Sequence, residues 1–420
     1  MSVGEHQKPT VSSSRADRWY FSLAFLFFLG FLVRVIFAPF TEHQFDVGTY
    51  KNMATLAYSL RINPLYYWSY GPIWLYIILS VYPFYLLVSL WQPSELLLNL
   101  IIKLPLIIGD LLLAYVLYLL SQKVTQDQSI AKKVAAAWLF NPLVIFVSSI
   151  HGMFDQLPAL FTLLSLTLLL NRKVKLSAIS LAVAFSLKLY AIILIPFLVF
   201  PLAKENMSKA LKFFAVFVGS TLLIYSPYLI DTHTVGILVS TLGIYSGFGK
   251  FLGYATGLAN FIPYADLPSP LVFILTHQLF ALLLPVLLVF LFYLWRKRQL
   301  FSFNIQVINR NIAIILLAYF LTYQFVHPQF TIWVLPSLLI AYSVLHQLRG
   351  YLYHTLWLAI FSWYGFQGFQ TFISTALIPA SSLGEQTLSV RVQVLMYLAD
   401  FVFVISCILC IVSLLRWRER

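Results

Sequence analysis

Charged residues and cysteines are both scarce in this chain. Only 10% of its 420 residues are charged, and 2 are cysteines. Soluble globular domains carry about 25% charged residues, so the composition excludes a soluble enzyme or binding module. Cys407 and Cys410 lie about one helical turn apart in a single apolar run, which argues against a disulfide framework or a zinc finger.

Apolar residues take the place of the missing charge. They make up 61% of the chain, and the mean hydropathy is +0.87. They are distributed in runs near 20 residues, a length that crosses a hydrocarbon core of about 30 Å as a helix. The alternating short strands of an outer-membrane barrel do not occur. The sequence therefore predicts an all-α multi-pass membrane protein with about twelve transmembrane helices.

The basic residues indicate an orientation and not a nucleic-acid partner. The net charge is +13, but these residues lie in short clusters between the apolar runs, as the positive-inside rule requires. Both termini are then cytoplasmic, and 1–18 is a disordered inner tail. We predict a catalytic membrane module over 19–268 with outer loops at 39–95 and 231–268, followed by C-terminal helices over 269–420. The membrane would be the cell membrane of a prokaryote or the endoplasmic reticulum of a eukaryote.

Two segments do not fit a plain crossing. Segment 70–91 is rich in tryptophan and tyrosine and contains Pro72 and Pro83, which favours helices lying in the membrane interface. Segment 176–202 has basic clusters at both ends, so a single crossing would leave one cluster outside. Two half-length helices meeting near Lys188 would keep both ends inside, an arrangement found where helices line a cavity.

With this orientation, polar residues collect on the outer side. Asp46 follows the first predicted helix, which covers 19–38. Two predicted outer turns contribute the others: His151, Asp155 and Gln156 in one, and His327 and Gln329 in the other. Because all three segments are predicted to lie on the outer side, we expect the bundle to bring them to one face, although they are far apart in the chain.

Five ionisable residues lie within apolar runs: Arg34, Lys103, Asp110, Lys188 and Asp400. Such residues are costly in a membrane and usually face a cavity or one another. Lys103 is shallow enough for its side chain to reach the headgroup level. Asp110 lies two turns from Lys103 on the same helix face, where it is placed to tune that lysine. Arg34 and Asp400 are more typical of structural partners inside a bundle.

A series of short motifs follows Asp46 in a characteristic order. They are Asn63-Pro64-Leu65-Tyr66-Tyr67, Tyr70-Gly71-Pro72-Ile73-Trp74, Lys103-Leu104-Pro105, Gly109-Asp110, Asn141-Pro142, His151-Gly152-Met153-Phe154-Asp155-Gln156, Lys188-Leu189-Tyr190 and Gln329-Phe330-Thr331-Ile332-Trp333. This order, over 19 to about 340, resembles the GT-C superfamily of integral membrane glycosyltransferases. It is most similar to members that use polyprenyl-phosphate sugars, such as the dolichyl-phosphate-mannose-dependent mannosyltransferases.

The resemblance implies a GT-C-like bundle with interfacial helices in the first outer loop. It implies that this loop carries the catalytic acid, which would be Asp46, and that the second outer loop holds further site residues. Gly48 stands where some relatives have a second acid. A divalent metal therefore lacks an acidic pair, and we predict neither a metal site nor a cofactor.

The resulting hypothesis is transfer of a sugar, most simply mannose, from a polyprenyl-phosphate donor to a glycolipid or glycan acceptor on the outer face. Because phosphate is a good leaving group, a single base, Asp46, would suffice and the reaction would invert the anomeric carbon. Lys103 and Lys188 would contact the donor phosphate. The predicted sugar and acceptor contacts are His151, Asp155, Gln156, His327 and Gln329.

A different class of protein fits some of the same features. Transporters and flippases for lipids or lipid-linked sugars also embed lysine, aspartate and arginine in helical bundles with half-length helices. Here the polar residues lie toward one face and not at the midplane, which favours the enzyme. A purely structural subunit of a glycosylation complex is a third possibility. In each interpretation the partners include membrane lipids and no nucleic acid.

Overall fold

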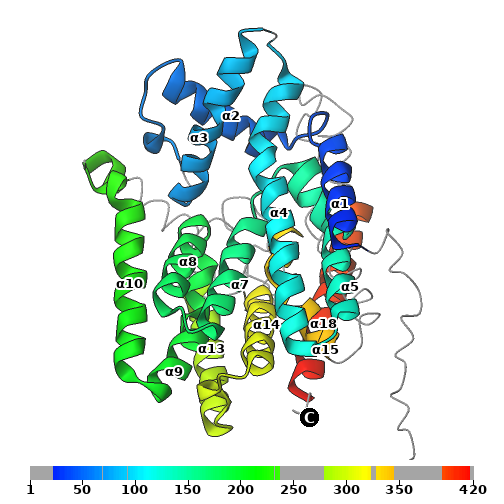
Figure 1. Cartoon of the computed structure of the whole chain (residues 1–420), viewed down its shortest axis with the longest axis vertical. Helices are drawn as coiled ribbons and strands as arrows, with labels where there is room; N and C mark the ends of the chain where they lie inside the picture. The colour runs from blue at the N-terminus through cyan, green and yellow to red at the C-terminus, as the bar shows by residue number, and fades with distance from the viewer. Residues whose placement is uncertain are drawn as a thin grey trace, which may run out of the picture.

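Every regular element in the described part of the chain is a helix (Figure 1). The computed structural model describes residues 22–68, 70–91, 93–230, 232–236, 279–322, 328–344 and 390–416. The predicted tail 1–18, most of the predicted outer loop 231–268, His327 and the side chain of Asp400 lie outside the described residues.

The first helices are α1 (Leu23–Phe37), α2 (Gln44–Tyr58), a short turn η2 (Pro64–Tyr66), α3 (Pro72–Ser89) and α4 (Glu95–Thr125). They include α2 and α3, which form one end of the bundle at the top in Figure 1, and α4, which runs from there along the length of the bundle. Polar side chains begin several of these helices. Ser22 and Ser94 accept hydrogen bonds from the backbone amides of Phe25 and Leu97, which satisfies a free amide at each helix start.

The next segment of the chain is bent. It consists of α5 (Gln128–Leu139), α6 (Pro142–Ile145) and a π-helical turn, η3 (Phe146–His151), followed by α7 (Gln156–Leu170). The bend between α5 and α6 is 46°. Pro142 cannot continue the preceding helix, and the Asn141 side chain begins the new one by accepting from the amide of Leu143.

The predicted break at Lys188 is present in the structure. The chain forms α8 (Val174–Leu187), the turn η4 (Leu189–Leu194), α9 (Ile195–Glu205), α10 (Met207–Tyr225) and η5 (Ser226–Leu229). Lys188 is extended, with φ −147° and ψ 134°. Arg172, just before α8, forms an ion pair with Glu205 at the end of α9. The two ends of this segment therefore lie side by side at one end of the bundle.

The C-terminal helices complete the core. They are α13 (Leu279–Arg296), η8 (Gln299–Phe301), α14 (Ile305–Thr322), η9 (Pro328–Trp333), α15 (Leu335–Val344) and α18 (Val390–Arg416). Helix α14 packs against α13, α15 and α18. It is the most buried of the long apolar helices, so it lies at the centre of the described bundle.

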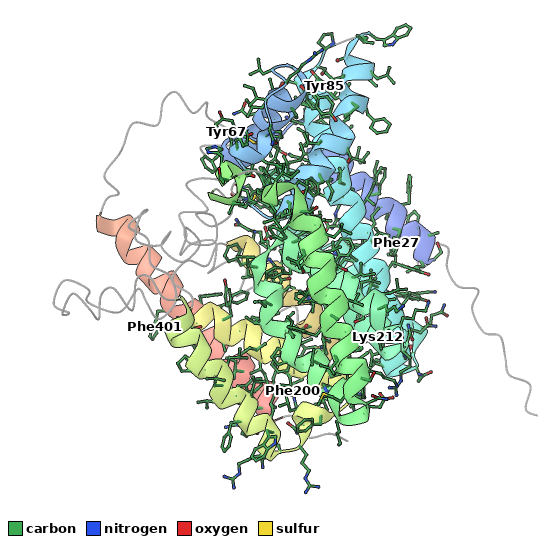
Figure 2. The ribbon with its side chains drawn as sticks, turned by 90° about the vertical axis from the view of Figure 1, so that its left-hand side faces the viewer. Phe27, Tyr67, Tyr85, Phe200, Lys212 and Phe401 are labelled. Carbon is green, nitrogen blue, oxygen red and sulfur yellow. The ribbon has the colours of Figure 1, made fainter. Side chains whose placement is uncertain are left out.

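Two large apolar clusters, with a third small one at Tyr118, Ala131 and Ala135, hold the described helices together. The largest one joins α4, α5, α7, α8, α10, α14, α15 and α18. The second large one packs α2 and α3 against the start of α4 through Tyr50, Trp68, Trp74 and Phe154. Many large apolar side chains remain outside these clusters, among them Phe401 of α18, and Figure 2 shows Phe27, Tyr85 and Phe401 at the outline of the bundle. Contiguous exposed apolar surface of this kind is typical of a membrane protein.

Among the described residues, four helical stretches are long and apolar enough to cross a membrane: α3, α4, Met207–Leu229 (α10 with η5), and α14. The bent pair of α5 with α6 and η3 adds a fifth if it crosses as one span. The predicted class, an all-helical multi-pass membrane protein, is thus confirmed. The count of about twelve spans and the interfacial position of 70–91 stay predictions, because α3 has the length and composition of a span.

Candidate functional site

Asp46 lies in the first turn of α2, and 6% of its surface is exposed. Its carboxylate has a partner on each oxygen. The Tyr70 hydroxyl donates to Oδ1 at 3.1 Å, and Nδ1 of His43 lies 2.5 Å from Oδ2. His43 is the residue at the start of α2, and its Nδ1 also accepts from the Asp46 amide at 3.3 Å. Asp46 is therefore held in a defined orientation at the helix start.

His151 approaches the same carboxylate from the second predicted turn. It ends the π-helical segment η3, and its Nε2 lies 4.0 Å from Oδ2 of Asp46. The His43 and His151 rings are 4.3 Å apart between centroids, and the His43 amide donates to the His151 carbonyl at 3.0 Å. The structure thus brings Asp46 and His151 together, as predicted, and adds His43. The signal that could have found it is a histidine three residues before Asp46.

Gly152 makes this close approach possible. Its φ of +83° is in the left-handed region, which strongly favours glycine. A Cβ at this position would lie 2.7 Å from Cγ2 of Val47 and 3.0 Å from Cε of Lys103. No side chain fits there without displacing one of these residues. The short turn after His151 is therefore packed directly against α2 and α4.

Lys103 is fully buried on α4, and backbone carbonyls surround its ammonium. It donates to the carbonyl oxygens of Ala38 at 3.2 Å, Ser149 at 2.8 Å and Ile150 at 3.2 Å, and to that of Thr41. These contacts tie the chain after α1 to the end of η3. Lys103 therefore connects the loop that precedes α2 to the turn that carries His151.

Asp110 does not face Lys103, so the prediction that it tunes that lysine is wrong. Its Oδ2 pairs with Nε of Arg34 on α1 at 2.8 Å, and both side chains are fully buried. Arg34 also donates through Nη1 to the carbonyls of Gly30 at 2.9 Å and Leu139 at 2.8 Å. The partner comes from a neighbouring helix and not from the same helix face. The expectation that Arg34 is a structural partner in the bundle agrees with these contacts.

Lys188 and Asp155 form a second ionic group beside the first. Nζ of Lys188 lies 2.7 Å from Oδ1 of Asp155, which also accepts from Nε1 of Trp333 at 2.8 Å. The ammonium lies over the rings of Phe330 at 4.8 Å and Phe154 at 5.0 Å, within reach of cation–π attraction. Lys188 is thus enclosed by a carboxylate and aromatic rings.

The electrostatics of Asp155 link the two groups. Burial raises the pKa of its carboxyl above the ordinary value, and the ammonium of Lys188 and the hydrogen bonds from Lys188 and Trp333 act against that rise. The nearby charge of Asp46 raises the pKa of Asp155 further. The pKa of Asp155 therefore depends first on its burial and on Lys188, and to a smaller extent on the charge of Asp46.

The remaining described residues of the predicted site, Gln156 and Gln329, are buried near these ionic groups. Gln156 is fully buried and donates through Nε2 to the Leu106 carbonyl at 3.3 Å. Gln329 is buried in η9, the turn that also carries Phe330 and Trp333. Trp333 is not among the predicted site residues, but its Nε1 donates to Oδ1 of Asp155 at 2.8 Å. Its place at the end of the motif over 329–333 is the sequence feature that could have identified it as a site residue.

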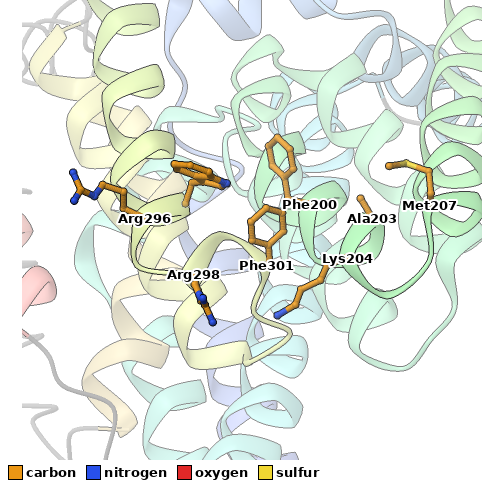
Figure 3. Close-up of a pocket in the computed structure, with 8 residues that line it drawn as sticks. Phe200, Ala203, Lys204, Met207, Arg296, Arg298 and Phe301 are labelled. Atoms are coloured by element: carbon orange, nitrogen blue, oxygen red, sulfur yellow. The ribbon is translucent and has the colours of Figure 1, made fainter.

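A separate cleft lies at the end of the bundle opposite α2 and α3, near α9 and α13 (Figure 1). Its volume is about 810 Å³. Figure 3 shows its lining of three cationic side chains and several apolar ones: Phe200, Ala203, Lys204, Met207, Trp295, Arg296, Arg298 and Phe301. Basic pockets between membrane helices accommodate anionic lipid headgroups. None of the predicted site residues lines this cleft.

The fold and these sites define a polytopic helical membrane protein with buried, paired ionic groups near one end. Residues 65–252 match the model of a protein family described as GPI transamidase subunit PIG-U. The matched region begins within η2, includes every element from α3 to η5 and covers somewhat less than half of the chain. A search of curated proteins found no match.

This match overturns the functional hypothesis drawn from the sequence. The matching family is described as a subunit of a GPI transamidase, not as a glycosyltransferase, a transporter or a flippase. The resemblance to polyprenyl-phosphate-sugar-dependent transferases was therefore wrong, together with the donor, the acceptor and the enzymatic activity that it implied. Asp46 is therefore not assigned as the base of a sugar transfer. The geometry of the site residues does not depend on that assignment.

Proposed function

We propose that this chain is a non-catalytic membrane subunit of a GPI transamidase complex, which attaches GPI anchors to proteins. The observation that carries the proposal is the family match over residues 65–252. Its partners are then the other subunits of that complex, and its membrane is that of the endoplasmic reticulum in a eukaryotic cell. The match includes Lys103, His151, Asp155 and Lys188, so it covers most of the ionic groups described above.

The way these groups are paired supports a scaffolding role. The charges of Lys103, Lys188 and Arg34 are each taken up by neighbours inside the chain: carbonyl oxygens, Asp155 and Asp110. A buried charge without such partners would cost several kcal/mol in a membrane. Groups that are satisfied in this way fix the relative positions of helices. A subunit that orients partners or substrates needs that rigidity more than it needs a free nucleophile or base.

The proposal is tested by removing the chain from cells that naturally express it. Loss of a transamidase subunit stops the attachment step, so complete GPI lipid and uncleaved precursor proteins should both accumulate. Loss of a sugar-transferring or lipid-flipping protein would instead leave truncated or misplaced GPI lipid. The lipids are analysed by mass spectrometry and the precursor by immunoblotting. Re-expression of the full chain should restore both, and truncated lipid would contradict the proposal.

We propose for the finer topology that 176–202 enters and leaves the membrane on one side as two half-length helices, with both termini cytoplasmic. The ion pair between Arg172 and Glu205 supports this, because it joins the two ends of the segment. The bundle would then hold about twelve helices, some of half length, with 70–91 in the interface.

Single cysteines test this topology directly. Lys173→Cys and Lys204→Cys replace exposed residues at the two ends of the segment, and the natural Cys407 and Cys410 are buried and give a low background. A membrane-impermeant thiol reagent should label both variants from the same side of sealed vesicles. Labelling from opposite sides would show a single crossing and contradict the proposal.

A further inference from the structure

We propose that His43, Asp46 and His151 form a binding site for one divalent transition-metal ion, with zinc as the best fit. The three residues come from the start of α2 and the end of η3. One ligand atom from each lies within 4.8 Å of the other two. This site goes beyond the proposed subunit function, and it is carried by the geometry of these three side chains.

The spacing of the ligand atoms suits a small metal ion. Zinc binds nitrogen and carboxylate oxygen at about 2.0–2.2 Å, so tetrahedral ligand atoms lie about 3.3 Å apart. Oδ2 of Asp46 lies 2.5 Å from Nδ1 of His43 and 4.0 Å from Nε2 of His151. Each separation differs from the tetrahedral value by less than about 1 Å. The third pair, between the two imidazoles, lies within 4.8 Å. Metal binding therefore requires rotation of the histidine side chains, and it replaces the 3.3 Å hydrogen bond from the Asp46 amide to Nδ1 of His43.

The donor set selects the class of metal. Imidazole nitrogen with one carboxylate suits zinc and the neighbouring divalent transition metals, whereas calcium and magnesium prefer oxygen ligands. Two neutral imidazoles and one carboxylate neutralise one of the two positive charges. Three protein ligands leave a fourth position for water or for a group from a partner or substrate, as in zinc sites that are not purely structural.

A second layer of contacts orients the ligands. The Tyr70 hydroxyl donates to Oδ1 of Asp46 at 3.1 Å, which directs the other oxygen toward the two imidazoles. The hydrogen bond from the His43 amide to the His151 carbonyl at 3.0 Å joins the two ligand segments. Outer partners of this kind fix ligand geometry in known metal sites. The histidine side chains are 19% and 15% exposed, so an ion can enter from solvent.

The ammonium of Lys103 lies near this cluster and would repel a bound cation, but the carbonyl oxygens around Lys103 offset its charge. Nζ of Lys103 contacts the carbonyls of Ser149 and Ile150, immediately before His151. Carbonyl oxygens from the loop after α1 also accept from this ammonium, which spreads its charge over several dipoles. The alternative for the cluster is a hydrogen-bonded carboxylate–imidazole group without metal, and metal analysis separates the two.

The experiment uses the full chain purified in detergent through an affinity tag without histidines. Elemental analysis should find about one zinc per chain, and cobalt substitution should give the visible d–d absorption of a nitrogen- and oxygen-ligated ion. His43→Ala and His151→Ala should lose the metal. Asp46→Asn, which keeps the side-chain shape, should weaken zinc binding in competition with a chromophoric chelator. Tyr70→Phe should weaken it about 10–100-fold, as expected for an outer partner.

His233→Ala is the matched control, because His233 packs against Tyr66 and is not one of the three ligands. That variant should keep the metal. The inference is overturned if the wild-type chain takes up no more zinc or cobalt than the His43→Ala/His151→Ala double variant. Because metal binding to wild-type protein is measured first, a variant that fails to fold does not leave the question open. A negative result leaves the test of GPI attachment unaffected.

Discussion

Replacing Asp110 by alanine should destabilise the bundle by about 3–5 kcal/mol, because Arg34 would keep a buried charge without its counter-ion. Both side chains are fully buried, and Nε of Arg34 lies 2.8 Å from Oδ2 of Asp110. The two remaining hydrogen bonds of Arg34, to the Gly30 and Leu139 carbonyls, cannot neutralise the guanidinium. The loss should therefore lie near the upper part of this range.

The double variant Arg34→Met/Asp110→Leu separates the cost of the unpaired charge from the value of the pair. Apolar residues of similar volume avoid the desolvation of both ions, and such replacements are often neutral or stabilising by about 1–4 kcal/mol. We therefore expect the double variant to be at least as stable as the wild type, with a coupling energy of several kcal/mol. Additive destabilisation by the two changes would refute this.

The assay is equilibrium unfolding of the purified protein in mixed detergent micelles, followed by the fluorescence of its 10 tryptophans. Lys209→Ala is the control, since this exposed lysine pairs with Glu205 on the surface. Its stability should match the wild type, because surface ion pairs contribute little. If Asp110→Ala is as stable as Lys209→Ala, Arg34 is not buried beside Asp110 as the structure has it.

Two further changes probe the packing of the site, each by the same unfolding assay. Gly152→Ala should cost at least about 1–2 kcal/mol because of its left-handed backbone and the 2.7 Å approach to Val47, whereas Gly219→Ala, with open space around it, should not destabilise. Lys188→Met should raise the pKa of buried Asp155 further. A carboxyl with a raised folded-state pKa binds more protons in the folded state, so this variant should lose stability as the pH rises above about 4. If the stability of Lys188→Met did not fall relative to the wild type above about pH 4, the pairing of Lys188 with Asp155 would be contradicted.

The sequence predicts the membrane class well because composition and run length follow from the thickness of the bilayer. It also predicts the break at Lys188, because a single crossing by 176–202 would place one of its two basic clusters on the outer side. The meeting of Asp46 and His151 follows from placing two loops on one face. All three predictions rest on local sequence pattern and on the predicted side of the membrane for each loop.

Partners from distant segments are not predictable in this way. Helix spacing suggests Lys103 for Asp110, but the actual partner, Arg34, comes from another helix 76 residues away. His43 is not predicted, because the expected site is built on acids, whereas the structure places two imidazoles beside Asp46. Only the packing of α1, α2 and η3 brings these groups together.

The error about function also has a structural cause. Several residues of the motifs that suggested a glycosyltransferase act in the architecture of the bundle. Asn63 and Asn141 cap helical turns by accepting backbone amides, and a Cβ on Gly71 would lie 2.0 Å from the carbonyl oxygen of Ser186. Trp333 orients Asp155. Motifs that specify how helices start and pack do not by themselves specify a reaction.

The proposed function of this chain is a role in the attachment of GPI anchors. It is tested most directly by measuring the GPI lipid and the precursor protein in cells from which the chain has been removed. We expect complete GPI lipid to accumulate together with uncleaved precursor, and re-expression to reverse both. Normal attachment of anchors in those cells, or truncated GPI lipid, would contradict the proposed function.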